Sequence, residues 1–244
     1  MSSRGSLHHA VTGWWRVHAG RDGTAVALRD LCREIWDFLR DSTPERCRQR
    51  YGDVEFDWDF RVNTTSATVG WRDRLLGVFH SPYQPTEPAV FHEMIARITE
   101  PLERFTFIDL GSGKGRTLLM ASQYPFRRII GVELLSELHR IAQQNIRDFR
   151  SSEQRCSDII SIEADARTFE FPDEPLVLYL FNPLPEDGLR TVMDKLSRSL
   201  ERKPREAWIL YHNPVLESVI AQIQGFEKVC GTAQYVLYRS VARS

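Results

Sequence analysis

The sequence has few of the residues that mark metal centres, membrane spans and basic nucleic-acid-binding surfaces. Its 244 residues include four cysteines, and no two of them have the C-x-x-C spacing of a zinc or redox site. The longest uninterrupted apolar run spans only 176–181, whereas a membrane helix needs about 20 apolar residues. Basic residues (32) and acidic residues (33) nearly balance, so the total charge does not indicate a strongly basic nucleic-acid-binding surface, although it leaves a local basic patch open. We therefore expect no metal, no membrane span and no strongly basic partner surface.

The N-terminal residues, MSSRGSLHHAVTG, lack the apolar segment of a secretion signal. We therefore expect a cytoplasmic protein whose scattered cysteines are reduced thiols. Apolar residues make up 42% and charged residues 27% of the chain, as in soluble globular proteins. The length suits one large domain, or one domain with an appendage.

The sequence changes character near residue 100. Beyond it, short β-branched apolar runs alternate with helical patterns, which predicts β-α-β units around a parallel sheet. Strands are predicted at 105–110, 128–133, 159–164, 176–181, 207–211, 226–230 and 235–239. Helices are predicted at 115–124, from Ser136 as the cap, at 186–200 and at 214–223. The last two strands lie close in sequence around Gly231, so we expect them to be antiparallel.

The first hundred residues have a different pattern. An amphipathic helix is predicted at 24–40, an irregular stretch at 41–87, and a helix with Thr86 as N-cap and Pro88 in its first turn. This last helix would bury Val90, Phe91, Met94, Ile95 and Ile98. Five tryptophans also lie in this part of the chain, at 14, 15, 36, 58 and 71. They form either a small core packed on the main domain or the lining of a substrate cleft or lid.

The segment that carries chemistry is FIDLGSGKGRTLL, residues 107–119. A glycine-rich turn between a strand and a helix lets a ligand approach the backbone, and the helix N-terminus offers unpaired N–H groups. The dinucleotide fingerprint G-x-G-x-x-G requires glycine where this chain has Arg116, and a P-loop cannot be aligned. Nicotinamide and nucleoside-triphosphate cofactors are therefore disfavoured.

The pattern D-x-G-S-G-x-G at 109–115 resembles the first motif of class I S-adenosylmethionine-dependent methyltransferases. Further motifs follow in the same order: Glu133 ends the second strand, Asp165-Ala166 follows the third, and Asn182-Pro183-Leu184-Pro185 ends the fourth. The resemblance covers about 83–240. It implies an α/β fold with a seven-stranded Rossmann-like sheet, mostly parallel with the last strand antiparallel. The expected domains are a mainly helical extension at 1–82, with a substrate lid as its candidate role, and a methyltransferase domain at 83–244.

The resemblance also implies the cofactor, S-adenosyl-L-methionine, and the residues that hold it. Asp109 would face the ammonium group, Glu133 would accept hydrogen bonds from the ribose diol, and Asp165 would contact the adenine amine. Lys114 is expected on the loop surface, and Arg116 is an alternative partner for the methionine carboxylate. The residues expected to bind the cofactor are Tyr83, Thr86, Asp109, Gly111, Ser112, Gly113, Gly115, Glu133, Asp165, Ala166 and Asn182.

The tetrapeptide Tyr83-Gln84-Pro85-Thr86 resembles the Y-x-P-T element of Dot1-like histone lysine methyltransferases and their bacterial relatives. This resemblance implies that Tyr83 and Thr86 close the cofactor site. The chain lacks the N-N-F-like signature and the basic tail of that group, so a nucleosomal substrate is not expected.

Asn182 is the predicted catalytic residue. In N-methyltransferases the N-P-P-aromatic motif holds an amine lone pair toward the methyl group, but here Leu184 and Pro185 replace the second proline and the aromatic residue. Methylation of a planar base is therefore disfavoured, and N-methylation of a protein side chain or a small molecule is expected. His212 is either a base or a capping histidine. Candidates for the missing acceptor contact are Tyr179, Phe181, Tyr211 and His212. The competing hypothesis is a non-catalytic methyltransferase-like binding module; a nicotinamide-dependent oxidoreductase comes third.

Overall fold

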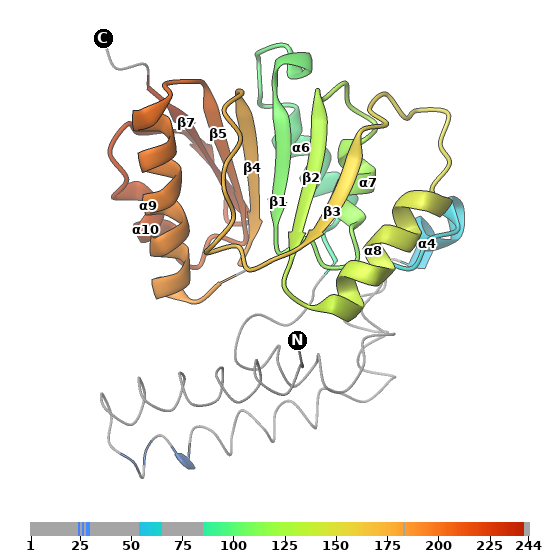
Figure 1. Ribbon diagram of the computed structural model, residues 1–244, viewed down its shortest axis with the longest axis horizontal. Coiled ribbons are helices and arrows are strands. Elements are labelled where there is room, and N and C mark those ends of the chain that lie inside the picture. Colours follow the sequence, from blue (N-terminus) through green and yellow to red (C-terminus); the bar gives the residue numbers. More distant parts are fainter. Residues whose placement is uncertain are drawn as a thin grey trace. The chain divides into compact units, whose positions relative to one another are not determined.

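The computed structural model describes residues 54–64, 85–182 and 184–241, together with Thr24, Val26, Leu28 and Arg29 (Figure 1). The chain divides into two compact units, one formed by Met1–Gly52 and Thr65–Gln84 and the other by Asp53–Thr64 and Pro85–Ser244. In the first unit the four described residues are helical and exposed, including Leu28 of the predicted apolar stripe. Tyr83, Pro183 and the side chains of the five N-terminal tryptophans lie outside the described residues.

Seven strands form one sheet in the second unit. They are β1 (Thr106–Leu110), β2 (Arg128–Glu133), β3 (Ile159–Glu163), β4 (Leu176–Phe181), β5 (Ala207–His212), β6 (Phe226–Gly231) and β7 (Tyr235–Ser240). The strand order is β3-β2-β1-β4-β5-β7-β6, and β7 runs antiparallel to both of its neighbours. The other pairs are parallel. The seven-stranded α/β fold expected from the sequence is confirmed.

Helices cover both faces of this sheet (Figure 1). They are α4 (Val54–Phe60), α6 (Pro88–Ile95), α7 (Arg116–Ala121), α8 (Ser136–Asp148), α9 (Glu186–Arg202) and α10 (Glu217–Ala221), with a short 3-10 turn at Leu102–Arg104. Buried side chains of α6 and α7 pack on one face, and those of α9 and α10 pack on the other. Strand β4 contributes side chains to the cores on both faces of the sheet, because successive side chains of a strand point to opposite faces. Its all-apolar sequence is therefore that of a central strand.

Three local expectations were wrong. Residues 54–60 were predicted to be irregular but form α4, in which the Phe56 and Phe60 rings pack with centroids 4.9 Å apart and planes tilted by 49°. Thr86 was predicted to cap α6, but Glu87 occupies the cap position and the Thr86 hydroxyl hydrogen-bonds the Tyr179 hydroxyl at 2.9 Å. Pro88 does lie in the first turn, and the five apolar residues predicted to face inward are buried. In α8 as well, the cap is Leu135 rather than Ser136.

Candidate functional site

The glycine-rich loop between β1 and α7 is held against the end of β2. Gly111, Gly113 and Gly115 have φ values of 82°, 55° and 83°, which glycine adopts without steric cost. The Gly111 and Ser112 amides both donate to the Val132 carbonyl, at 2.8 and 3.1 Å. Backbone groups therefore fix the loop at the carboxyl edge of the sheet, where open α/β sheets bind ligands.

Glu133, the last residue of β2, joins this loop to the start of α8. Its buried carboxylate accepts hydrogen bonds from the Gly113 amide and the Leu135 amide, each at 2.8 Å. Burial raises the pKa of Glu133, and these backbone donors oppose the rise. Because an ionised carboxylate has about four acceptor positions, it has room for further donors such as a ribose diol.

Asp109 lies one strand away, on β1, beside Gly131 of β2 and Tyr179 of β4. Its side chain is buried and accepts a hydrogen bond from the Thr117 hydroxyl. Burial raises the pKa of Asp109 to about 7, and the nearby Glu133 charge acts in the same direction. A cation bound at this carboxyl group would favour its ionised form.

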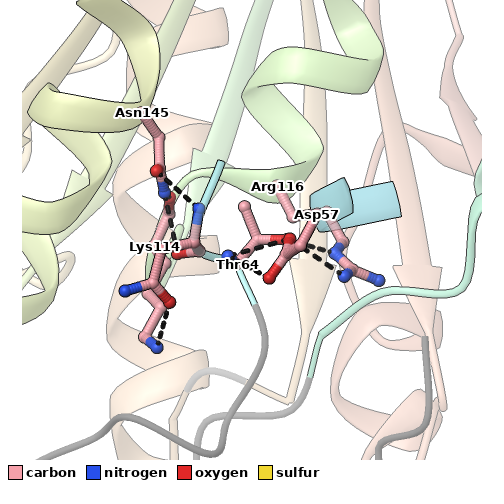
Figure 2. Close-up of polar contacts among 6 residues, drawn as sticks. Asp57, Thr64, Lys114, Arg116 and Asn145 are labelled. Carbon is pink, nitrogen blue, oxygen red and sulfur yellow. Dashed lines mark hydrogen bonds and ion pairs between the residues drawn. The ribbon is translucent and has the colours of Figure 1, made fainter. Parts of the chain in front are cut away.

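Lys114 was expected on the loop surface, and this was wrong. The side chain is fully buried, and its ammonium group donates to the Asn63 side-chain oxygen at 3.1 Å. Burial lowers the pKa of Lys114 to about 8. Arg116 is buried as well: its Nε donates to the Thr64 hydroxyl at 2.7 Å, and its guanidinium lies 3.5 Å from the Asp57 carboxylate (Figure 2). Both cations contact residues 54–64, which we call the clasp segment.

Ser112 points toward the sheet. A Cβ atom placed on Gly131 would lie 2.6 Å from the Ser112 Oγ, so the side chain packs directly on β2. The buried hydroxyl has no hydrogen-bond partner within the part of the chain that the structure describes. Any contact of Ser112 with a cofactor stays a prediction.

A chain of polar groups crosses the carboxyl ends of β4 and β5 on the α6 face. The Tyr179 hydroxyl lies 2.9 Å from the Thr86 hydroxyl and 2.9 Å from His212 Nδ1. The His212 ring stacks on Phe181, with centroids 4.1 Å apart and planes 25° apart. Burial lowers the pKa of His212 to about 4, so the ring is neutral near pH 7. Thr86, Asp109 and His212 are thus brought together around Tyr179.

Asn182 follows β4 with a positive φ of 44°, a conformation that asparagine tolerates better than most residues. Its side-chain oxygen accepts a hydrogen bond from the Tyr211 hydroxyl at 2.7 Å, and that hydroxyl accepts the Leu216 amide at 3.2 Å. Phe181 pairs with His212 in the β4–β5 register, which places Asn182 just beyond that pair. Asn182 is therefore fixed at the same sheet edge as the glycine-rich loop.

Asp165, which follows β3, is paired with Arg167. Its carboxylate accepts the Arg167 amide at 2.9 Å and forms an ion pair with the Arg167 guanidinium at 2.5 Å. Ala166 is buried in the core beneath α9. Roles for both residues in adenine binding stay predictions.

Sequence reasoning missed Asn145 and the clasp residues Asp57, Asn63 and Thr64. Asn145 donates to the Lys114 carbonyl at 2.9 Å and is buried on α8. One signal pointed to it: in the apolar stripe of this helix, Leu138 and Ala142 are followed at the next inward position by an asparagine. The clasp residues carry no comparable signal, because their partners lie far away in the sequence.

Within 54–64, 85–182 and 184–241, no group of histidine, cysteine, aspartate and glutamate side chains is arranged to hold a metal ion. None of the described helices is long and apolar enough to cross a membrane.

Comparison with known proteins gives no sequence match, since neither a protein-family model nor a curated protein matches this chain. Among solved structures, a glycopeptide N-methyltransferase complexed with S-adenosyl-L-methionine aligns with 64% of this chain and 94% of its own (12% identity, TM-score 0.49). A precorrin-6y C5,15-methyltransferase from Geobacter metallireducens aligns with 64% and 90% (15% identity, TM-score 0.49). An RNA methyltransferase from Salinibacter ruber, in complex with S-adenosyl-L-homocysteine, aligns with 64% and 92% (19% identity, TM-score 0.43). At such low identities, function must be argued from the residues themselves.

The packing of the glycine-rich loop on β2 makes Gly131 a sensitive position. An alanine Cβ there would lie 2.6 Å from both Leu118 Cδ1 and Ser112 Oγ and 2.9 Å from Ser112 Cβ, so the buried Leu118 and Ser112 side chains must shift. We expect Gly131→Ala to lower the free energy of unfolding by about 1–3 kcal/mol, measured by urea denaturation.

Gly188→Ala is the matched control for this substitution. The nearest atom to a new Cβ on Gly188 is Leu184 Cβ at 3.3 Å, and the residue lies in helix α9, where alanine is preferred to glycine. This variant should be as stable as the wild type or more so. Equal stability of Gly131→Ala and the wild type would contradict the close packing of loop and strand.

Proposed function

We propose that this protein is an S-adenosyl-L-methionine-dependent methyltransferase. The observation that carries the proposal is the buried Glu133 carboxylate, hydrogen-bonded to the amide of Gly113 in a loop of three positive-φ glycines. A carboxylate at the end of β2, beside a glycine-rich backbone, suits a ribose diol and the chain attached to it. The position of Arg116 disfavours a dinucleotide in the same place.

Residues beside the loop suit the amino-acid end of this cofactor. Asp109 would pair with the ammonium group, and Thr86, held by Tyr179, would lie on the α6 side of the same carboxyl group. When bound, S-adenosyl-L-methionine supplies an electrophilic methyl group on a sulfonium. The protein's task is then to align an acceptor and exclude water.

For the acceptor we propose the edge formed by Asn182 and His212. The Tyr211 hydroxyl orients the Asn182 amide, which would hold an acceptor amine with its lone pair toward the methyl group. His212 hydrogen-bonds the Tyr179 hydroxyl through Nδ1 and lines this edge as a neutral ring; because burial lowers its pKa to about 4, it is too weak a base to deprotonate a charged amine, so the acceptor amine would arrive neutral. These groups favour N-methylation.

We propose a protein side chain or a small molecule as the acceptor, in the cytoplasm. The chain has Leu184 and Pro185 where a stacking aromatic residue would recognise a planar base, and its total charge is −1. A nucleic-acid acceptor is therefore disfavoured.

A methyl-transfer screen tests the proposal directly. Purified protein is incubated with tritium-methyl-labelled cofactor and cell extract, and radioactivity is measured in the protein, RNA and small-molecule fractions. Label in the protein or small-molecule fraction is expected. Cofactor binding without transfer to any fraction would instead support the non-catalytic binding module.

Cofactor affinity should depend on pH through Asp109. Its pKa is raised to about 7 in the free protein, so below that pH a proton must leave before the carboxylate pairs with an ammonium group. Binding of S-adenosylhomocysteine should therefore strengthen up to about tenfold from about pH 6 to pH 8 and then level off. Calorimetry in buffers of different ionisation enthalpy would detect the released proton. Asp109→Asn should bind more weakly and show no such rise; a rise that persists in it would assign the proton elsewhere.

Substitution of Asn182 separates catalysis from support of the fold. Because Asn182 has a φ of 44°, Asn182→Gly removes the side chain without straining the backbone. We expect S-adenosylhomocysteine affinity close to wild type and turnover lower by about ten- to a thousandfold.

Tyr211→Phe is the companion variant, since it leaves Asn182 in place and removes only the hydroxyl that orients it. Its turnover should fall between those of the wild type and Asn182→Gly. If Asn182→Gly lost thermal stability but kept wild-type turnover, Asn182 would be a strand-end cap and not a catalytic residue.

A further inference from the structure

The Asp57 carboxylate holds the two ends of a turn within the clasp segment together. Both Asp57 oxygens accept the Thr64 amide, at 2.9 and 2.8 Å, and the Thr64 hydroxyl donates to the same carboxylate. The Asp57 carbonyl also accepts the Val62 amide at 3.1 Å. These bonds give residues 57–64 a fixed turn that presents the Thr64 side chain.

Aromatic side chains anchor this turn beside the glycine-rich loop. The rings of Phe60 and Phe149 are 5.1 Å apart, which joins α4 to the end of α8. The Arg116 guanidinium lies 5.0 Å from the Phe56 ring centroid, a cation–π distance. The clasp segment thus packs on the first turn of α7 and the last turn of α8.

The polar contacts of the clasp segment converge on the second half of the loop. Arg116 is the first residue of α7 and directly follows Gly115, whose φ is 83°. Its guanidinium is held by Thr64 and Asp57 (Figure 2). A fixed Arg116 therefore fixes the point at which the glycine-rich loop ends and α7 begins.

Asn145 ties the clasp segment to the loop a second time. It accepts the Asn63 amide and donates to the Asn63 carbonyl, each at 2.9 Å, and it also donates to the Lys114 carbonyl at 2.9 Å. The Lys114 ammonium group in turn donates a hydrogen bond to the Asn63 side-chain oxygen at 3.1 Å. One side-chain amide thus holds the backbone of both segments.

We propose that residues 54–64 clamp the cofactor-binding loop, and that Asp57, Asn63, Thr64 and Asn145 are positioning residues for S-adenosyl-L-methionine. The inference rests on the proposed function, because it concerns the same site. Three glycines give the loop many conformations, and losing them on binding costs free energy. A docked clasp segment selects the bound conformation beforehand and so raises affinity. In turn, the cofactor should stabilise the docked clasp segment.

Substitution of Asp57 tests the clamp, and Asp59 supplies the control. Asp57→Asn keeps the shape and removes the charge facing Arg116, whereas Asp59 is an exposed residue on the same helix. We expect Asp57→Asn to weaken S-adenosylhomocysteine binding by about ten- to a hundredfold and Asp59→Asn by less than about twofold. Calorimetry and thermal unfolding are measured on both variants. A lower melting temperature with wild-type affinity in Asp57→Asn would overturn the proposal.

The hydroxyl of Thr64 allows a rescue experiment. Thr64→Val keeps the shape of this buried side chain but removes the acceptor for Arg116, and Thr64→Ser restores it. We expect Thr64→Val to lower affinity by about tenfold and Thr64→Ser to recover most of that loss. Equal affinities for the two variants would contradict the role of the hydroxyl.

Hydrogen exchange is measured on the wild-type protein, so this test does not depend on whether a variant folds. Amides 57–64 should exchange more slowly when S-adenosylhomocysteine is bound, as should the loop amides. Protection of the loop alone would overturn the clamp and leave the proposed function intact. If the wild type bound no S-adenosylhomocysteine, the proposed function itself would fail.

Discussion

The hydrogen bond from the Gly113 amide to the buried Glu133 carboxylate is the contact on which the site depends. It joins the loop after β1 to the end of β2. The positive-φ backbone of the loop and the Glu133 carboxylate therefore lie side by side at the sheet edge. Removing a carboxylate from water is costly unless hydrogen bonds replace the lost solvation, and two backbone amides do this for Glu133. The same arrangement leaves the carboxylate oriented for a ligand that brings hydroxyl donors.

Two buried cations add a second constraint. Lys114 and Arg116 lie within and directly after the glycine-rich loop, and burial of their charges requires hydrogen bonds and a nearby carboxylate. The clasp segment supplies both, through Asn63, Thr64 and Asp57. Local order in the loop is therefore coupled to a segment that precedes the first strand by more than forty positions.

Most of the sheet domain was predictable from the sequence, because its signals are local. The apolar run of β4, the helical spacing of apolar residues in α9 and the alternating glycines each specify an element from neighbouring residues. The errors came from long-range contacts. Lys114 was expected to be solvated, but its partner Asn63 lies 51 positions away in the sequence. Asn145 also hydrogen-bonds Asn63, across 82 positions. Thr86 resembled a helix cap because a threonine before Glu-Pro is a common helix start, yet its hydroxyl is used by Tyr179.

Calorimetric titration of the purified protein with S-adenosylhomocysteine, with NAD as the competing ligand and Glu133→Gln as the matched variant, tests the central claim most directly. The account predicts binding of S-adenosylhomocysteine, no binding of NAD, and affinity weakened at least about tenfold in Glu133→Gln, which keeps the shape of the side chain but loses the charge. Binding of NAD without S-adenosylhomocysteine, or unchanged affinity in Glu133→Gln, would contradict the assignment of Glu133 and its glycine-rich loop to this cofactor.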